Sequence, residues 1–128
     1  MSRSRFIFAF PTALLAGFVA IPASADQLPI DGNFGNEAGC QALADPTSAA
    51  ETKITVTAQK VDFYESSCDF LQVLTGSYGR SVITALCAGE GEDWVATYLV
   101  TPSGGAPDLL HFKLQGTDEF EFIVSKCK

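Results

Sequence analysis

Four cysteines are the residues of this chain whose type and spacing best define a chemistry: Cys40, Cys68, Cys87 and Cys127. They are separated by 27, 18 and 39 residues. Structural zinc sites place cysteines in close pairs, about two to four residues apart, and exchangeable redox pairs use a Cys-x-x-Cys spacing. We therefore expect neither a metal site nor a redox site, and we predict two structural disulfides.

A second cluster combines carboxylates with an aromatic side chain: Glu65, Glu90, Glu92, Asp93 and Trp94. Paired carboxylates can share general acid and base work, and acids crowded into one turn can attract Ca²⁺. However, the segment lacks the ligand spacing of a Ca²⁺ loop, and the ends of hairpins commonly carry exposed acids. We interpret the five residues as an interaction rim, with no catalytic role, metal or cofactor.

The single histidine, His111, lies between Leu110 and Phe112 in an alternating segment. This alternation predicts a surface position on the face opposite to both neighbours. Ser103 and Asp108 are close in sequence, but no nucleophile-elbow or oxyanion motif accompanies them. We therefore expect no enzymatic activity.

The elements that must position these residues are predicted to be short β-strands. From about residue 52 onward, apolar and polar residues alternate, β-branched residues are frequent, and Gly-containing turns recur. The preceding residues, 26–48, are rich in Gly, Asn and Asp and predict a loop with a short helical turn at 40–44. Strands are predicted at residues 53–58, 61–64, 68–74, 81–87, 94–100, 109–114 and 119–125.

The predicted fold is all-β, an antiparallel meander of about seven to eight strands. Spacing this close leaves no room for crossover helices, so neighbouring strands form hairpins. Closure into a small barrel or near-barrel would hide the sheet edges, and a two-layer sandwich is the alternative. The side chains predicted to point inward on the last hairpin are Leu110, Phe112, Leu114, Phe120, Phe122 and Val124.

The disulfide pairing follows from the register of one hairpin. If residues 77–78 form a two-residue loop, Cys68 lies directly opposite Cys87, at a separation that suits a disulfide. Cys40 would then pair with Cys127. A slip of one residue would remove this opposition, so Cys40–Cys68 with Cys87–Cys127 remains the alternative.

The N-terminal 25 residues have the pattern of a secretory signal peptide. Two arginines precede an apolar stretch over residues 6–21, and Ala-Ser-Ala at 23–25 supplies the small residues of a cleavage site. Cleavage after Ala25 would leave residues 26–128 as one disulfide-stapled β domain. Cysteine usage and the signal together predict a periplasmic or secreted protein.

Charge restricts the partners of this predicted mature chain, which has six Lys or Arg and fifteen Asp or Glu, a net charge of −9. Proteins that bind nucleic acid or anionic membranes depend on basic clusters, so we expect neither as a partner. A basic secreted protein, such as a lysozyme or a protease, fits this charge better. We expect a monomer.

The order of motifs resembles a group of small exported four-cysteine proteins of Gram-negative bacteria that are uncharacterised. The resemblance rests on Glu65-Ser66-Ser67-Cys68, a Glu-x-x-Cys motif, followed by Cys87-Ala88-Gly89-Glu90-Gly91, a Cys-x-Gly-Glu-Gly motif. It covers nearly the whole predicted mature chain and implies a periplasmic setting, without implying a reaction.

Two classes of function fit the sequence. The first is a non-catalytic protein-binding module, similar in size to the small β-barrels that inhibit lysozymes or proteases. The alternative is a carrier that holds a small apolar ligand in a cavity of the barrel. Interior volume and capture of a partner would distinguish the two.

Overall fold

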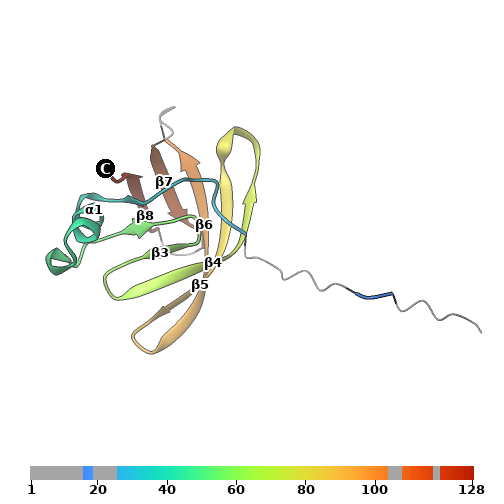
Figure 1. The fold of residues 1–128 in the computed structure, drawn as a ribbon, viewed down its shortest axis with the longest axis horizontal. Coiled ribbons are helices and arrows are strands. Elements are labelled where there is room, and N and C mark those ends of the chain that lie inside the picture. Colours follow the sequence, from blue (N-terminus) through green and yellow to red (C-terminus); the bar gives the residue numbers. More distant parts are fainter. Residues whose placement is uncertain (1–15, 19–25, 104–107, 117–118) are drawn as a thin grey trace, which may run out of the picture.

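The computed structural model describes residues 16–18, 26–103, 108–116 and 119–128 (Figure 1). Most of the predicted signal peptide lies outside these residues, so its cleavage stays a prediction. In the described part of the chain, no helix has both the length and the apolar character needed to cross a membrane.

Eight antiparallel strands form a closed barrel in chain order, with the first strand pairing with the last (Figure 1). The predicted barrel is thereby confirmed, and the sandwich alternative is wrong. The strands are β1 (Phe34–Gly35), β2 (Thr55–Val56), β3 (Lys60–Asp62), β4 (Ser66–Thr75), β5 (Ser81–Gly89), β6 (Glu92–Pro102), β7 (Leu109–Leu114) and β8 (Glu121–Lys126).

Strand length divides the barrel into two parts. The strands β4, β5 and β6 have 10, 9 and 11 residues, whereas β2, predicted over residues 53–58, has only 2. In Figure 1 the hairpin between β4 and β5 projects upward, and the hairpin between β5 and β6 projects downward. The three long strands therefore present surfaces at both ends of the barrel that the short strands do not cover.

Aromatic side chains fill the interior of the barrel. Phe112 and Phe122 stack with ring centroids 4.9 Å apart, and Tyr98 and Phe63 meet the Phe122 ring edge-on. Phe120 was predicted to point inward, but 42% of its surface is exposed. It precedes β8, so the strand alternation does not fix its direction, and it packs against Phe63 at the margin of the core.

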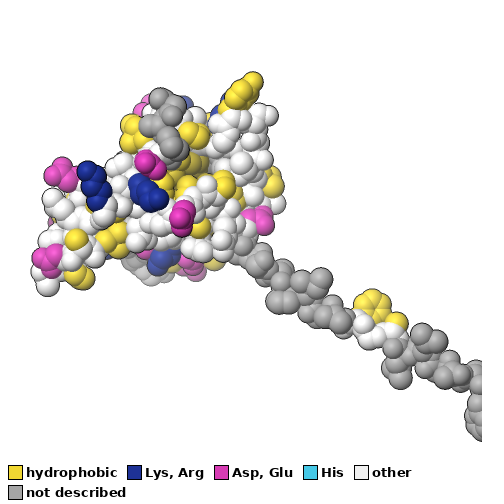
Figure 2. Space-filling model, turned by 45° about the horizontal axis from the view of Figure 1, so that its top comes forward, with side chains coloured by type: hydrophobic (Ala, Val, Ile, Leu, Met, Phe, Trp, Pro, Cys, Tyr) yellow, Lys and Arg dark blue, Asp and Glu magenta, His cyan; other side chains and the backbone are white. Residues whose placement is uncertain are grey.

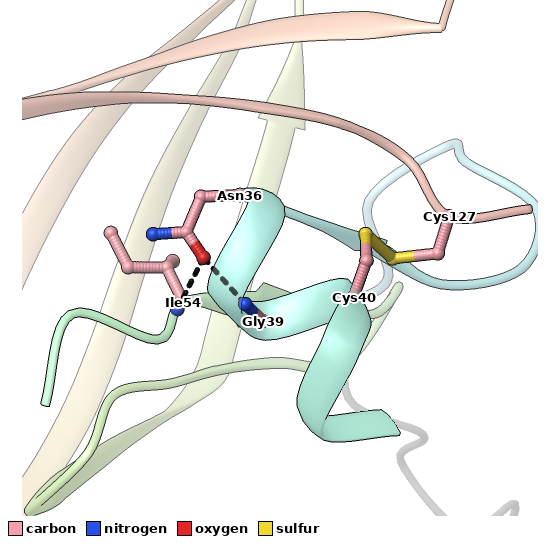
Figure 3. Close-up of a disulfide and its surroundings, with 5 residues drawn as sticks. All are labelled: Asn36, Gly39, Cys40, Ile54 and Cys127. Atoms are coloured by element: carbon pink, nitrogen blue, oxygen red, sulfur yellow. Dashed lines mark hydrogen bonds between the residues drawn. A yellow bond between two sulfur atoms is a disulfide. The ribbon is translucent and has the colours of Figure 1, made fainter. Parts of the chain in front are cut away.

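One short helix, α1 (Glu37–Ala44), is held against the barrel by hydrogen bonds to the Asn36 side chain and by a disulfide (Figure 3). The Asn36 side-chain oxygen accepts hydrogen bonds from the Gly39 N–H at 2.7 Å and the Ile54 N–H at 2.9 Å. This is an N-cap that also binds a neighbouring segment. The helix begins three residues earlier than the predicted turn, and a 3₁₀ turn, η1 (Pro46–Ser48), follows it. Cys40 of this helix is bonded to Cys127, which follows β8.

The second disulfide joins Cys68 to Cys87, directly opposite each other on β4 and β5. The predicted pairing is confirmed, but the predicted hairpin loop is wrong. The Gly76 N–H binds the Arg80 carbonyl, so the connection is longer and contains a 3₁₀ turn, η2 (Ser77–Gly79). A bulge between Phe70 and Gln72 adds one residue to β4 and restores the opposition of the two cysteines.

Candidate functional site

A shallow groove of about 310 Å³ lies at the end of the barrel where β4 begins and the hairpin between β5 and β6 turns. The groove collects four of the five residues of the predicted rim. Its lining consists of Glu65, Ser66, Gly89, Glu90, Glu92 and Trp94.

The tight turn between β5 and β6 places Glu90 in the groove wall. Gly89 pairs with Glu92, which leaves Glu90 and Gly91 as the two loop residues, with φ angles of 51° and 77°. Two positive φ angles define the hairpin turn that favours Asn-Gly, so a glutamate here adopts a strained backbone, at a cost of roughly 1 kcal/mol. The turn therefore carries a carboxylate where local stability would favour another residue.

Gly89 permits the close approach of β4 that brings Glu65 to the groove. A Cβ at residue 89 would lie 2.8 Å from the Ser66 Cβ and 2.9 Å from the Glu65 carbonyl oxygen. A side chain at this position would therefore push the two strands apart. Glycine is required here because there is no room for a side chain. Its φ angle is not in the left-handed region, so backbone conformation is not the reason.

Trp94 forms the apolar part of the groove. It lies directly opposite Cys87, and 42% of its surface is exposed. Glu92 and Trp94 share the strand face that continues inward as Ala96. Asp93, the fifth residue of the predicted rim, pairs with Ala88 and lies on the opposite, outer face of β6, so it does not line the groove.

The carboxylates of the groove form no ion pair with any residue that the structure describes. The ion pairs within the described ranges are Lys60–Asp62 at 3.2 Å and His111–Glu121 at 3.0 Å. Three unpaired carboxylates beside an exposed indole favour a cation, through charge attraction and through the ring face. Across residues 26–103, 108–116 and 119–128, no three His, Cys, Asp or Glu side chains are arranged to hold a metal ion.

His111, the histidine considered for catalysis, is half-buried on β7. Its Nε2 lies 3.0 Å from the Oε2 of Glu121 on β8. The two residues lie diagonally across the hairpin, since His111 is opposite Ile123. This is the geometry of a cross-strand surface pair.

The four cysteines all lie in disulfides, and no cysteine is free. Cys68 and Cys87 are buried in the interior of the barrel, while Cys40 and Cys127 lie near its surface. Two such bonds indicate an oxidising compartment outside the cytoplasm.

The sequence analysis missed an apolar surface on the outside of the long strands. Leu74 on β4, Val82 on β5 and Val95 on β6 are all exposed. The sequence contained a sign of this surface. Apolar residues occupy both odd and even positions along β5 and β6, although only every second residue of a strand can face the interior. Figure 2 shows hydrophobic side chains at several places on the barrel surface, beside acidic and basic ones.

Comparisons with protein families, with curated proteins and with solved structures found no match to this chain. The resemblance to small exported four-cysteine proteins stays a prediction. The geometry of the described residues is therefore the basis for the functional argument.

Proposed function

We propose that this protein is a non-catalytic binding module whose acidic groove accepts a Lys or Arg side chain of a basic secreted protein, such as a lysozyme or a protease. The observation that carries the proposal is that Glu65, Glu90 and Glu92 line one groove together with the exposed Trp94. The protein acts in the periplasm or outside the cell, after removal of residues 1–25.

Both the net charge of the chain and the local charge of the groove support this proposal. The net charge of −9 for residues 26–128 attracts a basic protein over long range and raises the rate of encounter. The groove then supplies a specific contact, because its carboxylates have no cationic partner among the described residues. A tryptophan bordered by charged groups is typical of residues that dominate the binding energy at interfaces.

The strained turn supports a binding role for Glu90. A positive φ angle of 51° costs free energy for a glutamate, and no hydrogen bond of its side chain to a described residue offsets this cost. Retention of local strain is common where a side chain must be presented to a ligand.

The interior of the barrel favours the binding module over the ligand carrier. Phe112 and Phe122 stack across the interior, and Tyr98 packs against both rings. A carrier of the kind considered above would need open volume where these rings lie.

Titration calorimetry against a panel of basic lysozymes and secreted proteases, at low and moderate salt, tests the proposal. We expect one member of the panel to bind saturably and more weakly at moderate salt. The double variant Glu90→Asn/Glu92→Gln should weaken that binding by at least about tenfold, and Trp94→Ala should do the same. Since Asn is favoured at this turn, the double variant should remain folded.

The matched control removes the same number of charges outside the groove. Asp31→Asn/Glu119→Gln neutralises two exposed acids that do not line it, and should change the affinity by less than about threefold. Equal losses in the two double variants would mean that only net charge matters. No binding to any member of the panel would reject basic lysozymes and proteases as partners.

A further inference from the structure

The first residues of β6 form an open edge of the sheet. β7 pairs with β6 only from Tyr98 to Pro102, so residues 92–97 extend beyond this ladder. In Figure 1 the hairpin between β5 and β6 accordingly reaches well below β7 and β8. Every residue from Glu92 to Val95 is exposed. An exposed strand edge offers backbone N–H and C=O groups to another chain.

The backbone groups at this edge belong to Asp93 and Val95. The two-residue turn closes with a hydrogen-bonded pair that includes Glu92, and bonds to β5 then recur at every second residue of β6. The intervening residues direct their backbone groups away from β5, as the bond from the Gln115 N–H to the Thr97 carbonyl at 2.8 Å shows. Among the residues that the structure describes, none hydrogen-bonds to the backbone of Asp93 or Val95 at this edge.

The corresponding edge of β4 is covered. β3 pairs with β4 only up to Asp69. Beyond this residue, the Gln59 carbonyl accepts the Phe70 N–H at 2.8 Å. The Asp26 side chain accepts the Val73 N–H at 3.5 Å. Folded proteins commonly cover sheet edges in this way, so the open edge of β6 is a candidate for an interface.

The acidic residues of this edge determine which strand can be added to it. Glu90, Glu92 and Asp93 follow one another closely in the turn and the first residues of β6. Charged side chains at an edge repel a second copy that carries the same charges. The same side chains attract a segment of opposite charge. The occupant that fits is therefore an extended basic segment of another protein.

We propose that a basic segment of the partner adds to the β6 edge as an antiparallel strand and so brings its Lys or Arg side chain to the acidic groove. This inference rests on the proposed function and specifies how the partner binds. Hydrogen bonds to the backbone of Asp93 and Val95 hold the segment, and its alternate side chains provide specificity. The antiparallel orientation is the more stable of the two possible pairings.

The two faces of the added strand meet different surroundings. Glu92 and Trp94 lie on the groove face of β6, whereas Val95 lies on the outer face. Because neighbouring strands are about 4.8 Å apart, a Lys or Arg beside Trp94 can lie over the indole ring and reach the Glu92 carboxylate. The adjacent residue of the segment lies beside Val95, where an apolar side chain fits. The expected recognition sequence therefore alternates basic and apolar residues.

A soluble peptide of alternating Lys and Val, added to the disulfide-bonded protein, tests the inference by calorimetry and amide hydrogen exchange. In the complex, the N–H groups of Asp93 and Val95 should exchange at least about tenfold more slowly. The Val residues of the peptide lie beside Val95, so their amides face β6. N-methylation of the Val amides should therefore weaken binding by at least about tenfold, whereas N-methylation of the Lys amides should not.

A matched pair of protein variants tests the edge itself. Val95→Pro removes the N–H that faces away from β5, so it blocks the edge and leaves the bonds between β5 and β6 in place. This variant should weaken peptide binding by at least about tenfold. Val95→Thr keeps the N–H and the β-branched shape, and should weaken binding by less than about threefold.

Unchanged exchange at Asp93 and Val95 in the complex, or equal effects of the two methylated peptides, would overturn strand addition. Binding that Glu90→Asn/Glu92→Gln weakens but Val95→Pro does not would also overturn it, and would leave the groove as the binding site of the proposed function. Absence of peptide binding would reject the strand, while the lysozyme and protease panel tests the groove separately. A dimer of the chain that Val95→Pro dissociates would reject a basic partner as the occupant.

Discussion

Replacement of Gly39 by alanine should destabilise the protein by about 2–4 kcal/mol, although alanine is the better helix former. An added Cβ would overlap the Ile54 carbonyl group, far inside the ordinary van der Waals contact distance, and would lie 3.0 Å from the Asn36 Oδ1. The carbonyl of Ile54 accepts the Asn36 N–H at 3.1 Å, so the obstacle is hydrogen-bonded backbone. Neither side of this contact can rotate away.

The magnitude follows from what must move. Restoring an ordinary carbon–oxygen contact requires α1 to retreat by an ångström or more, and overpacking of this kind costs about 1–3 kcal/mol. The retreat also stretches the bonds from Asn36 to Gly39 and Ile54, each worth about 1 kcal/mol. The higher helix propensity of alanine offsets about 1 kcal/mol of this destabilisation. Because Cys40–Cys127 tethers α1, the helix cannot simply detach.

Urea unfolding with the disulfides intact, followed by circular dichroism, measures the change. The control is Gly76→Ala, where the nearest atom to an added Cβ is the Arg80 carbonyl oxygen at 4.0 Å and φ is −104°. This control should lie within about 0.5 kcal/mol of the parent chain. A Gly39→Ala variant as stable as the Gly76→Ala variant would refute the reasoning.

The remaining predictions concern the crosslinks and the pH dependence of stability. Limited reduction should open the Cys40–Cys127 disulfide before Cys68–Cys87, because Cys68 and Cys87 are only 1% and 0% exposed. Alkylation of the freed thiols and peptide mapping would show this order. Earlier labelling of the buried pair would contradict it. Loss of the outer bond should cost about 4–5 kcal/mol on the chain-entropy model, since it closes a sequence separation of 87. Burial raises the pKa of Tyr98, so the folded state resists its ionisation. The free energy of unfolding should therefore fall as the pH rises above the ordinary tyrosine pKa of about 10, and the fall should be smaller in Tyr98→Phe; equal falls in both chains would reject this origin.

The type of each element was largely predictable from local pattern. Alternation over residues 81–87 and 109–114 predicts strands, and the structure contains them as β5 and β7, with Phe112 and Leu110 buried as expected. Short connections predict antiparallel pairing. Both inferences depend only on residues adjacent in the chain, where a period of two gives a side chain its face.

The pairing of Cys68 with Cys87 was predicted correctly from a loop that does not form. A two-residue loop sets one register, the longer loop around η2 shifts it by one residue, and the bulge between Phe70 and Gln72 shifts it back. Both irregularities depend on how the two strands twist against the rest of the barrel. The local sequence pattern does not predict that twist.

The candidate surfaces also separate into two kinds. The sequence alone determined that the chain is acidic, contains four well-separated cysteines and has acids beside Trp94, because these are properties of composition and spacing. Only the tertiary structure decided that Glu65 joins Glu90 and Glu92, that Asp93 faces away, and that Val82 and Val95 lie outside the barrel. These outcomes depend on register and closure between strands, which are fixed by contacts among residues far apart in the chain.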